Sequence, residues 1–407
     1  MRRFLALLMT LLILPLASFA EETDPVPTQE PTPVPVPTLT PAPTPVPTPT
    51  LEELWDQYAE ARFRGRKIVC GAVIIARDGE MLYSYCYGNK TRSSRDAVTL
   101  DTCFRIASVT KLVTAVGLMQ LLEEQDISLE TPVKDIVGFP VVNPAFPDQD
   151  ITIRQVMSHT SSFIQTQYYH PNWETLQVKN KYFSTTAAPG TAYAYSNLNG
   201  GLFGAMIEAL SGQSVNTYMR EHVFGPLGIN AAYHMALLPD QSDLAPQLSK
   251  SGTIAEGVSV SLASISEYDD TCNPRANTHH TSGGLIISAN GLIRIISMLQ
   301  RGGELDGVRI LSEEAVALMM QDQQTIPGSS VLCQSEYGLA MARVENMPGG
   351  TWYGHQGRMK GLSSNIYFQP DTGLSIAVIA NGYEAQSVDG VVSIARVFME
   401  KAQELLP

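Results

Sequence analysis

Residues 104–125 have the sequence FRIASVTKLVTAVGLMQLLEEQ, which contains the only Ser-x-x-Lys pattern of the chain, Ser108 to Lys111. The residues after Ser108 are apolar on nearly every side of a helix, which predicts that the helix is buried together with the lysine in its first turn. The i, i+3 spacing places Lys111 over Ser108. A desolvated ammonium has a lowered pKa and can accept or relay a serine proton. The alternative is a helix-capping serine followed by a surface lysine.

The bulk composition predicts a globular protein with a large core. The chain has 407 residues, of which 44% are hydrophobic, with 27 Lys and Arg against 40 Asp and Glu. This balance excludes a collagen-like or wholly disordered chain. The formal net charge of −13 repels phosphate backbones, so we expect no nucleic-acid partner.

The first fifty residues predict export and a spacer. Residues 1–20 combine two arginines, an apolar run and small residues at the end, a pattern typical of a secretory signal peptide. An uncleaved membrane anchor is the alternative, although the run is short for a spanning helix. Residues 21–50 are rich in Pro and Thr and predict an extended linker. We therefore expect a secreted or extracytoplasmic protein, at most peripheral to a membrane or wall through this linker.

The remaining residues, 51–407, predict one catalytic domain of the α/β class (an α+β sandwich). Helical spacing covers 51–61, strands are predicted at 68–76 and 81–87, and the middle of the chain from 107 to 300 is mostly helical. Further strands are predicted at 352–355, 362–369 and 374–380, and a helix at 387–405. This order predicts an antiparallel sheet built from both termini, flanked by helices, with an inserted helical subdomain.

The five cysteines are widely scattered and give no metal-ligand spacing. An odd number in an exported chain leaves at least one thiol without an intramolecular partner. Cys70 and Cys86 lie on the two predicted strands of one hairpin, and a disulfide between them is a hypothesis.

Two further elements carry candidate chemistry. Tyr195 and Asn197 are separated by one residue; a phenol near a lysine can share its proton, and an amide can orient substrate and lysine. His355 and Gly357 end a predicted strand, and the N–H of Arg358 beyond it could form half of an oxyanion hole with the N–H of Ser108. Each element also has an ordinary structural explanation when taken singly. Tyr195 could be a packing tyrosine in a turn, and His355 could be a structural histidine.

In this order and with these separations, the elements resemble the serine β-lactamase and penicillin-binding family, specifically its class C-like branch. That branch includes D-alanyl-D-alanine carboxypeptidases, D-aminopeptidases and esterases. The likeness extends over roughly residues 66–400. The matching stretches are residues 104–111, 157–161, 189–190, 195–197, 282–285 and 354–357.

The resemblance implies an acyl-enzyme mechanism without a metal or organic cofactor. Ser108 would attack a carbonyl while Lys111 and Tyr195 handle the proton. The resemblance further implies that the substrate is bound by Asn197, His355, Gly357 and Arg358. Whether the lysine or the tyrosine is the base stays open.

Two departures from the family pattern bear on substrate and geometry. Class C β-lactamases carry Lys-Thr-Gly where this chain has His-Gln-Gly at 355–357, and losing that ammonium weakens recognition of a β-lactam carboxylate. Ser162 stands where the family often has glycine, so a positive φ there would be strained. We therefore expect hydrolysis of peptide-like amides, including cell-wall peptides, or of esters. The alternatives are a β-lactamase and a penicillin-binding sensor without turnover.

Overall fold

The computed structural model describes residues 49–164, 173, 182–255, 270–276, 280–323, 337–388 and 390–405. Pro49–Pro407 form one compact unit. The expected signal peptide and nearly all of the expected linker lie outside the described residues. Among the described residues, no helix has both the length and the hydrophobicity to cross a membrane.

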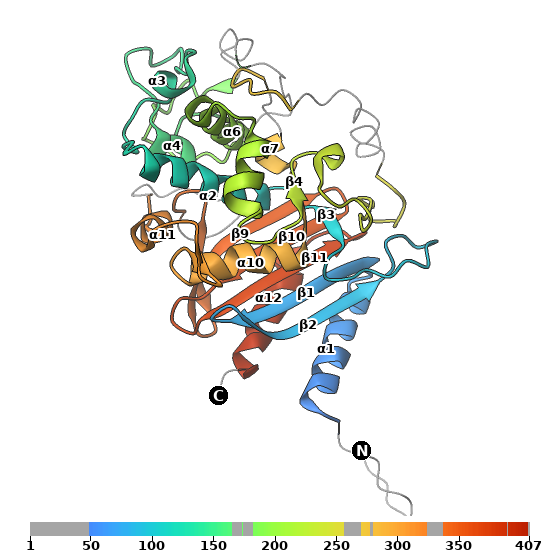
Figure 1. Cartoon of the computed structure of the whole chain (residues 1–407). Coiled ribbons are helices and arrows are strands. Elements are labelled where there is room, and N and C mark those ends of the chain that lie inside the picture. The colour runs from blue at the N-terminus through green and yellow to red at the C-terminus, as the bar shows by residue number, and fades with distance from the viewer. Residues whose placement is uncertain are drawn as a thin grey trace, which may run out of the picture. The chain divides into compact units, whose positions relative to one another are not determined.

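A six-stranded antiparallel sheet with the strand order β2-β1-β11-β10-β9-β8 forms the centre of the fold. Its strands are β1 (Cys70–Arg77), β2 (Glu80–Gly88), β8 (Ala342–Met347), β9 (Gly350–Met359), β10 (Leu362–Phe368) and β11 (Leu374–Asn381). The first strand pairs with the last of them, from Cys70 opposite Asn381 to Arg77 opposite Leu374. Figure 1 shows this meeting of the two ends of the chain as blue strands beside orange-red ones. The predicted antiparallel sheet built from both termini is therefore confirmed.

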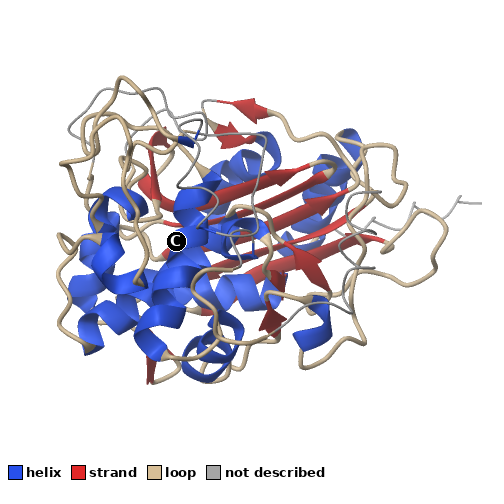
Figure 2. Ribbon diagram, turned by 90° about the horizontal axis from the view of Figure 1, so that it is seen from above, coloured by secondary structure: helices blue, strands red, loops and turns tan. Residues whose placement is uncertain are grey.

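Helices cover both faces of the sheet because its strands are apolar on both sides. In β1, Val73 and Ile75 pack with α1 (Leu51–Gly65) and α12 (Ser393–Ala402). Their neighbours Ala72 and Ile74 pack with the opposite cluster, which contains α2 (Val109–Glu124) and α10 (Ala289–Gln300). Successive side chains of a strand point to opposite faces, which explains the division. Figure 2 shows helices on both sides of the strands.

The segment between β2 and β8 forms the helical part and three small strand pairings. Besides α2 and α10, its helices are α3 (Val133–Val137), α4 (Ile153–Met157), α6 (Asn197–Ser211), α7 (Val215–Met219), α9 (His280–Gly283) and α11 (Glu313–Met320). The π-helix Arg220–Phe224 and the 3-10 helix Met235–Leu237 also lie here, and a second 3-10 turn, Gln403–Leu405, follows α12. Short sheets join β3 (Cys103–Arg105), β5 (Ile286–Ser288) and β4 (Ala231–Ala232), and join β6 (Glu304–Leu305) with β7 (Val308–Arg309).

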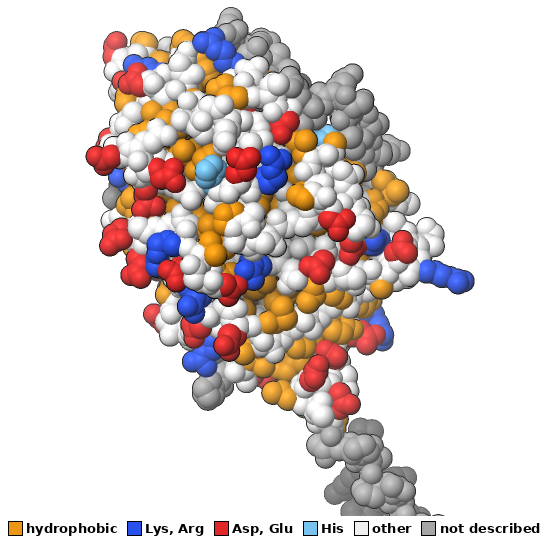
Figure 3. Space-filling model, in the orientation of Figure 1, with side chains coloured by type: hydrophobic (Ala, Val, Ile, Leu, Met, Phe, Trp, Pro, Cys, Tyr) orange, Lys and Arg blue, Asp and Glu red, His pale blue; other side chains and the backbone are white. Residues whose placement is uncertain are grey.

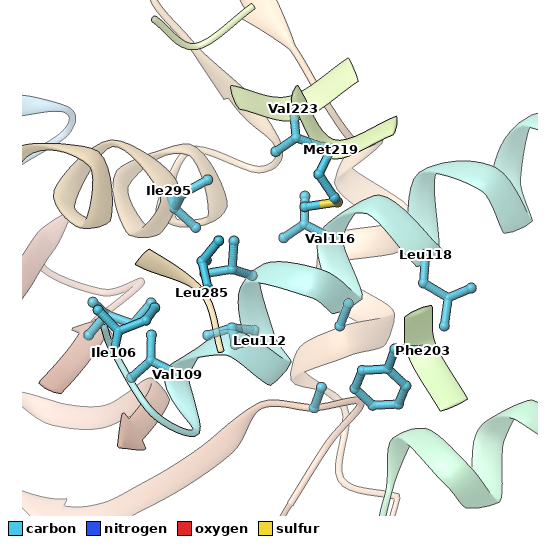
Figure 4. Packing of buried hydrophobic residues seen from close by; sticks show 14 of the residues in the cluster. Ile106, Val109, Leu112, Val116, Leu118, Phe203, Met219, Val223, Leu285 and Ile295 are labelled. Carbon is cyan, nitrogen blue, oxygen red and sulfur yellow. The ribbon is translucent and has the colours of Figure 1, made fainter. Parts of the chain in front are cut away.

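Helix α2 lies in the middle of the hydrophobic core. Thirteen of its residues are buried, and Lys111 is among them. Figure 4 shows Leu112 and Val116 of this helix packed among Leu285 and Ile295. Each buried aliphatic side chain of this size stabilises the fold by about 1.5–3 kcal/mol. The prediction of a buried helix directly after Ser108 is confirmed.

Two predicted elements, the last helix and the strand at 352–355, differ most from their predicted bounds. The last helix begins at Ser393 instead of 387, because β12 (Ser387–Val388) and β13 (Val391–Val392) form a hairpin before it. Gly390 has φ +80° in this hairpin, a value that is incompatible with the interior of a right-handed helix, so the helix cannot extend back through this residue. The strand predicted at 352–355 extends over the whole of β9, and β8 was not predicted.

The hypothesis of a disulfide in the β1–β2 hairpin was wrong. Cys86 lies opposite Ala72, and Cys70 lies opposite Gly88. The cysteines are thus diagonal neighbours, whose Cα atoms are about 7–8 Å apart, beyond the usual reach of a disulfide. Both thiols are free.

Acidic and basic side chains are interspersed on the surface. On the face drawn in Figure 3, Asp and Glu outnumber Lys and Arg, and the basic groups stand singly or in small groups. This distribution agrees with the net charge of −13.

Candidate active site

Ser108 lies at the turn that leads into α2. It is half-buried, has helical backbone angles, and its side chain makes no capping hydrogen bond to the helix. This excludes the alternative of a helix-capping serine. The preceding residue, Ala107, has φ +49°. Such a conformation costs about 1 kcal/mol or more in a residue other than glycine, and this turn keeps it next to the candidate nucleophile.

Lys111 is fully buried and surrounded by oxygen atoms. Its Nζ lies 3.3 Å from Ser108 Oγ, 2.7 Å from Asn197 Oδ1 and 2.6 Å from the Ser282 carbonyl oxygen. Burial lowers the pKa of Lys111 from 10.5 to about 7. A substantial fraction of the amine is therefore neutral at pH 7 and can accept a proton from the serine hydroxyl.

Tyr195 and Asn197 reach the lysine from the start of α6. Ser196 caps this helix by accepting a hydrogen bond from the Leu198 N–H, so Asn197 is its first residue. The Lys111 Nζ lies 5.1 Å from the centre of the Tyr195 ring. The structure thus brings together Ser108, Lys111, Tyr195 and Asn197, although the last two lie more than eighty positions downstream.

Gly357 places strand β9 directly against Ser108. A Cβ atom on Gly357 would lie 2.3 Å from the Ile106 carbonyl oxygen, 2.5 Å from Ser364 Oγ and 3.1 Å from the Ser108 nitrogen. Only glycine fits in this space. Beyond Gly354, no described residue pairs with the outer edge of β9, because β8 pairs with it only up to that position.

The His355 side chain is buried and bonded within the protein. Its Nε2 lies 3.1 Å from the Tyr337 hydroxyl, and its Nδ1 lies 2.8 Å from the Gln356 carbonyl oxygen. Burial and the nearby Lys111 ammonium lower its pKa to about 3. The ring is neutral at physiological pH, and a direct contact with substrate would require it to leave both partners.

Arg358 is exposed at the end of the same strand. Its guanidinium donates to the Ala385 carbonyl oxygen at 2.5 Å and to Ser387 Oγ at 3.2 Å. Successive residues of a strand face opposite sides of the sheet, and Gly357 faces Ser108. The Arg358 side chain therefore points to the opposite face of the sheet from Ser108. Its backbone N–H is the one that the sequence suggests as an oxyanion donor.

Sequence reasoning gave no role to several residues of the site. The Ser282 carbonyl oxygen binds the lysine, and a Cβ on Gly200 would lie 2.9 Å from Lys111 Cε. The Gly200-Gly201 pair inside an apolar helical stretch was a signal of close packing. His159 and Tyr337 were likewise given no role, and both rings lie near the site.

Ser162 does adopt the positive φ that its position suggested. Its φ is +67°, its Oγ accepts a hydrogen bond from Asn143 Nδ2 at 3.0 Å, and its carbonyl oxygen accepts one from the Ser184 N–H. These bonds hold a conformation that glycine would adopt without strain.

Comparisons with known proteins agree with this geometry. The family model described as Beta-lactamase matches residues 54–392. Penicillin-binding protein 4 of Amycolatopsis lactamdurans is 27% identical over 346 residues, which cover 82% of this chain and 86% of that protein. D-alanyl-D-alanine-carboxypeptidase/endopeptidase AmpH of Escherichia coli (strain K12) is 30% identical over 186 residues, which cover 44% of this chain and 48% of that protein.

The fold is shared with a solved relative. The octameric penicillin-binding protein homologue from Pyrococcus abyssi superposes with a TM-score of 0.66 and 23% identity, covering 84% of this chain and 75% of that one. The chain therefore belongs to the β-lactamase family of serine hydrolases, which has penicillin-binding, carboxypeptidase and esterase relatives.

Proposed function

We propose that this protein is an exported serine hydrolase that forms an acyl-enzyme on Ser108. The observation that carries the proposal is the buried Lys111 amine, which lies within hydrogen-bond distance of both Ser108 Oγ and Asn197 Oδ1. Ser108 Oγ forms a bond to the substrate carbonyl carbon while its proton passes to the amine or to the phenol of Tyr195. The proton then goes to the leaving group as the carbonyl–leaving-group bond breaks, and water later hydrolyses the ester.

The proposed mechanism gives the activity a defined pH dependence. Neutral Lys111 accepts the proton, and protonated Lys111 cannot, so activity falls as pH drops through the lysine pKa of about 7. The N–H groups of Ser108 and Arg358 are the proposed oxyanion donors. The close approach of Gly357 to the Ser108 nitrogen supports this, because it brings the two backbone segments together.

The proposed substrates are peptide-like amides with D-amino acids, and small esters. Two observations support them. Among the described residues, no strand pairs with the outer edge of β9 beyond Gly354, so an extended peptide could pair there as an added strand. One relative is named a D-alanyl-D-alanine-carboxypeptidase/endopeptidase and another an esterase. His355 is neutral, so it supplies no positive charge for the carboxylate of a β-lactam.

Three substrates offered in parallel to the purified domain, residues 51–407, test the proposal. We expect a D-alanyl-D-alanine peptide and a short-chain aryl ester to be hydrolysed, and a chromogenic cephalosporin to be the poorest substrate. Ser108→Ala abolishes turnover in each case. Efficient cephalosporin cleavage would instead support a β-lactamase, and product that stops near one equivalent per enzyme would support a penicillin-binding sensor.

The proposed location is outside the cytoplasm, in the cell envelope or medium. The charged start, apolar run and small residues of 1–20 support a signal peptide, and the Pro and Thr of 21–50 support a linker. N-terminal sequencing of the protein from the culture medium or envelope tests this. A mature N-terminus near residue 21 is expected, and an intact Met1 in a membrane fraction would contradict cleavage.

A further inference from the structure

His159 lies beside the proposed site, yet the steps above give it no task. It follows helix α4, is 1% exposed, and has φ +58°. Few residues other than glycine adopt this left-handed conformation, although histidine and asparagine do so more readily than most. The conformation directs both its carbonyl oxygen and its imidazole toward the segment that contains Tyr195.

His159 binds the residues on both sides of Tyr195. Its carbonyl oxygen accepts a hydrogen bond from the Ala194 N–H at 2.8 Å, and its Nδ1 accepts one from the Ser196 N–H at 3.3 Å. The imidazole also packs against the Tyr195 ring, with 4.3 Å between the ring centres. One residue therefore holds the tyrosine through its preceding peptide, its following peptide and its ring.

The hydrogen bonds of the imidazole define its protonation. A backbone N–H can only donate, so Nδ1 is an acceptor and the proton resides on Nε2. Asn199 agrees with this assignment, because its Nδ2 lies 2.9 Å from Nδ1 while its Oδ1 accepts from Ser161 Oγ at 2.6 Å. Burial, reinforced by the Lys111 ammonium and by His355, holds the pKa of His159 well below its ordinary value of 6.5. A protonated ring would lose both of these Nδ1 hydrogen bonds.

A second ring continues the contact to the other wall of the site. The Tyr337 ring lies 5.2 Å from the His159 ring, and its hydroxyl lies 3.1 Å from Nε2 of His355 on β9. The buried side chains of His159, Tyr337 and His355 and the half-buried ring of Tyr195 thus form one group between the start of α6 and strand β9.

We propose that His159 is a positioning residue whose neutral, Nε2-protonated imidazole fixes the Tyr195 segment and holds the phenol ring beside Lys111. The inference rests on the proposed function, since it assigns His159 the task of aligning a proton carrier. His159 acts through Tyr195 and does not contact the substrate. Loss of the imidazole therefore changes the proton-transfer step more than substrate binding.

Two variants separate the effect of losing the imidazole ring from the effect of losing the hydrogen-bond acceptor at the position of Nδ1. His159→Ala removes both, whereas His159→Asn keeps an oxygen near the place of Nδ1 and suits a positive φ. With a short-chain aryl ester at pH 5–10, we expect His159→Ala to lower kcat about 100-fold and to change KM less than about threefold. We also expect the midpoint of its pH profile to move by about half a pH unit or more. His159→Asn recovers about tenfold in kcat.

Phe163→Leu is the matched control for a loss of aromatic packing nearby. Phe163 is 2% exposed, and its ring stacks on that of Phe183 with 4.5 Å between centres. We expect this variant to lower the melting temperature without moving the pH midpoint. A midpoint that moves equally in Phe163→Leu would overturn the inference, because the effect would then come from general destabilisation.

The remaining outcomes also decide the matter. Folded His159 variants with the kcat and pH midpoint of the wild type would refute the positioning role. If His159→Ala does not fold, Asn199→Ala removes the side-chain donor to Nδ1 together with the acceptor of Ser161 Oγ. An unchanged kcat and midpoint in that variant and in His159→Asn refute the role equally. Failure of the proposed function looks different: the wild type itself would not be labelled at Ser108 by a serine-directed acylating probe.

Discussion

Replacing Lys111 with methionine should change how the stability of the protein depends on pH. The folded-state pKa of about 7 lies below the value of 10.5 for an exposed lysine, so between these pH values the unfolded chain binds a proton that the folded chain does not. The wild type therefore becomes more stable as pH rises through this window. The 3.5-unit difference (10.5 − 7) corresponds to a cost of about 5 kcal/mol near pH 6 and about 2 kcal/mol at pH 9.

The variant removes this cost but also removes the hydrogen bonds that the lysine donates to Asn197 Oδ1 and to the Ser282 carbonyl oxygen. The loss of each hydrogen bond costs about 1–3 kcal/mol. The two contributions oppose each other at pH 6, so the absolute stability of the variant is a poor measure of the buried charge. The pH dependence of the stability measures the buried charge directly, because the acceptors of the lost hydrogen bonds do not titrate in this pH range.

Urea unfolding of wild type and Lys111→Met at pH 6 and pH 9 provides the measurement. The difference between their free energies of unfolding cancels the other titrating groups and should change by about 2–3 kcal/mol, with the wild type gaining at pH 9. Lys360→Met, at an exposed position, controls for the loss of a lysine. A difference that is the same at both pH values would refute a desolvated amine, and with it the argument that Lys111 can take the serine proton.

Three other substitutions test the packing and charge of the site. Gly200→Ala places a Cβ 2.9 Å from Lys111 Cε and 3.1 Å from Ser282 Cα. Thermal unfolding should therefore show that the free energy of unfolding falls by about 1–3 kcal/mol, and ester turnover should fall as well. The control Gly65→Ala, whose Cβ meets open space, should retain activity. Gly357→Ala moves β9 away from the nucleophile and should slow acylation by a serine-directed probe about 100-fold; an unchanged rate contradicts the proposed placement. Arg358→Gln should leave the ratio of kcat/KM for a carboxylate-terminated peptide to that for its amide unchanged, because the guanidinium lies on the opposite face of the sheet from Ser108, and a ratio lower by about tenfold would contradict this placement.

The parts of the site that could be predicted are those encoded locally. A serine and a lysine three residues apart before an all-round apolar helix require only helix geometry and burial to be interpreted, and Ser108 and Lys111 lie as that geometry demands. The same holds for the sheet, because β1 and β11, which come from opposite ends of the chain, are nearly continuous apolar runs. Local patterns failed at 387–392, where a short hairpin stands before the last helix.

The unpredicted parts depend on contacts between distant segments. The carbonyl oxygen that binds Lys111 belongs to Ser282, and no side-chain pattern reveals which backbone oxygen will face a buried amine. His159 carries out its proposed task through hydrogen bonds to Ala194 and Ser196, which lie more than thirty positions away. Such pairings follow from how α4, α6 and α9 pack around α2, and this packing is determined only once the whole core is assembled.

Strand β9 carries no positive charge on the face that lies against Ser108. His355 is neutral where class C β-lactamases carry lysine, and the nearest cation along the strand is Arg358, three positions on and on the opposite face. Among the described residues, its guanidinium donates to a carbonyl oxygen and to a hydroxyl oxygen. A charge pair at about 4 Å near a protein surface is worth about 1–4 kcal/mol, enough to direct substrate choice. The carboxylate of a fused β-lactam is held rigidly near its carbonyl, where the proposed site offers no such charge, so we expect a β-lactam to bind weakly.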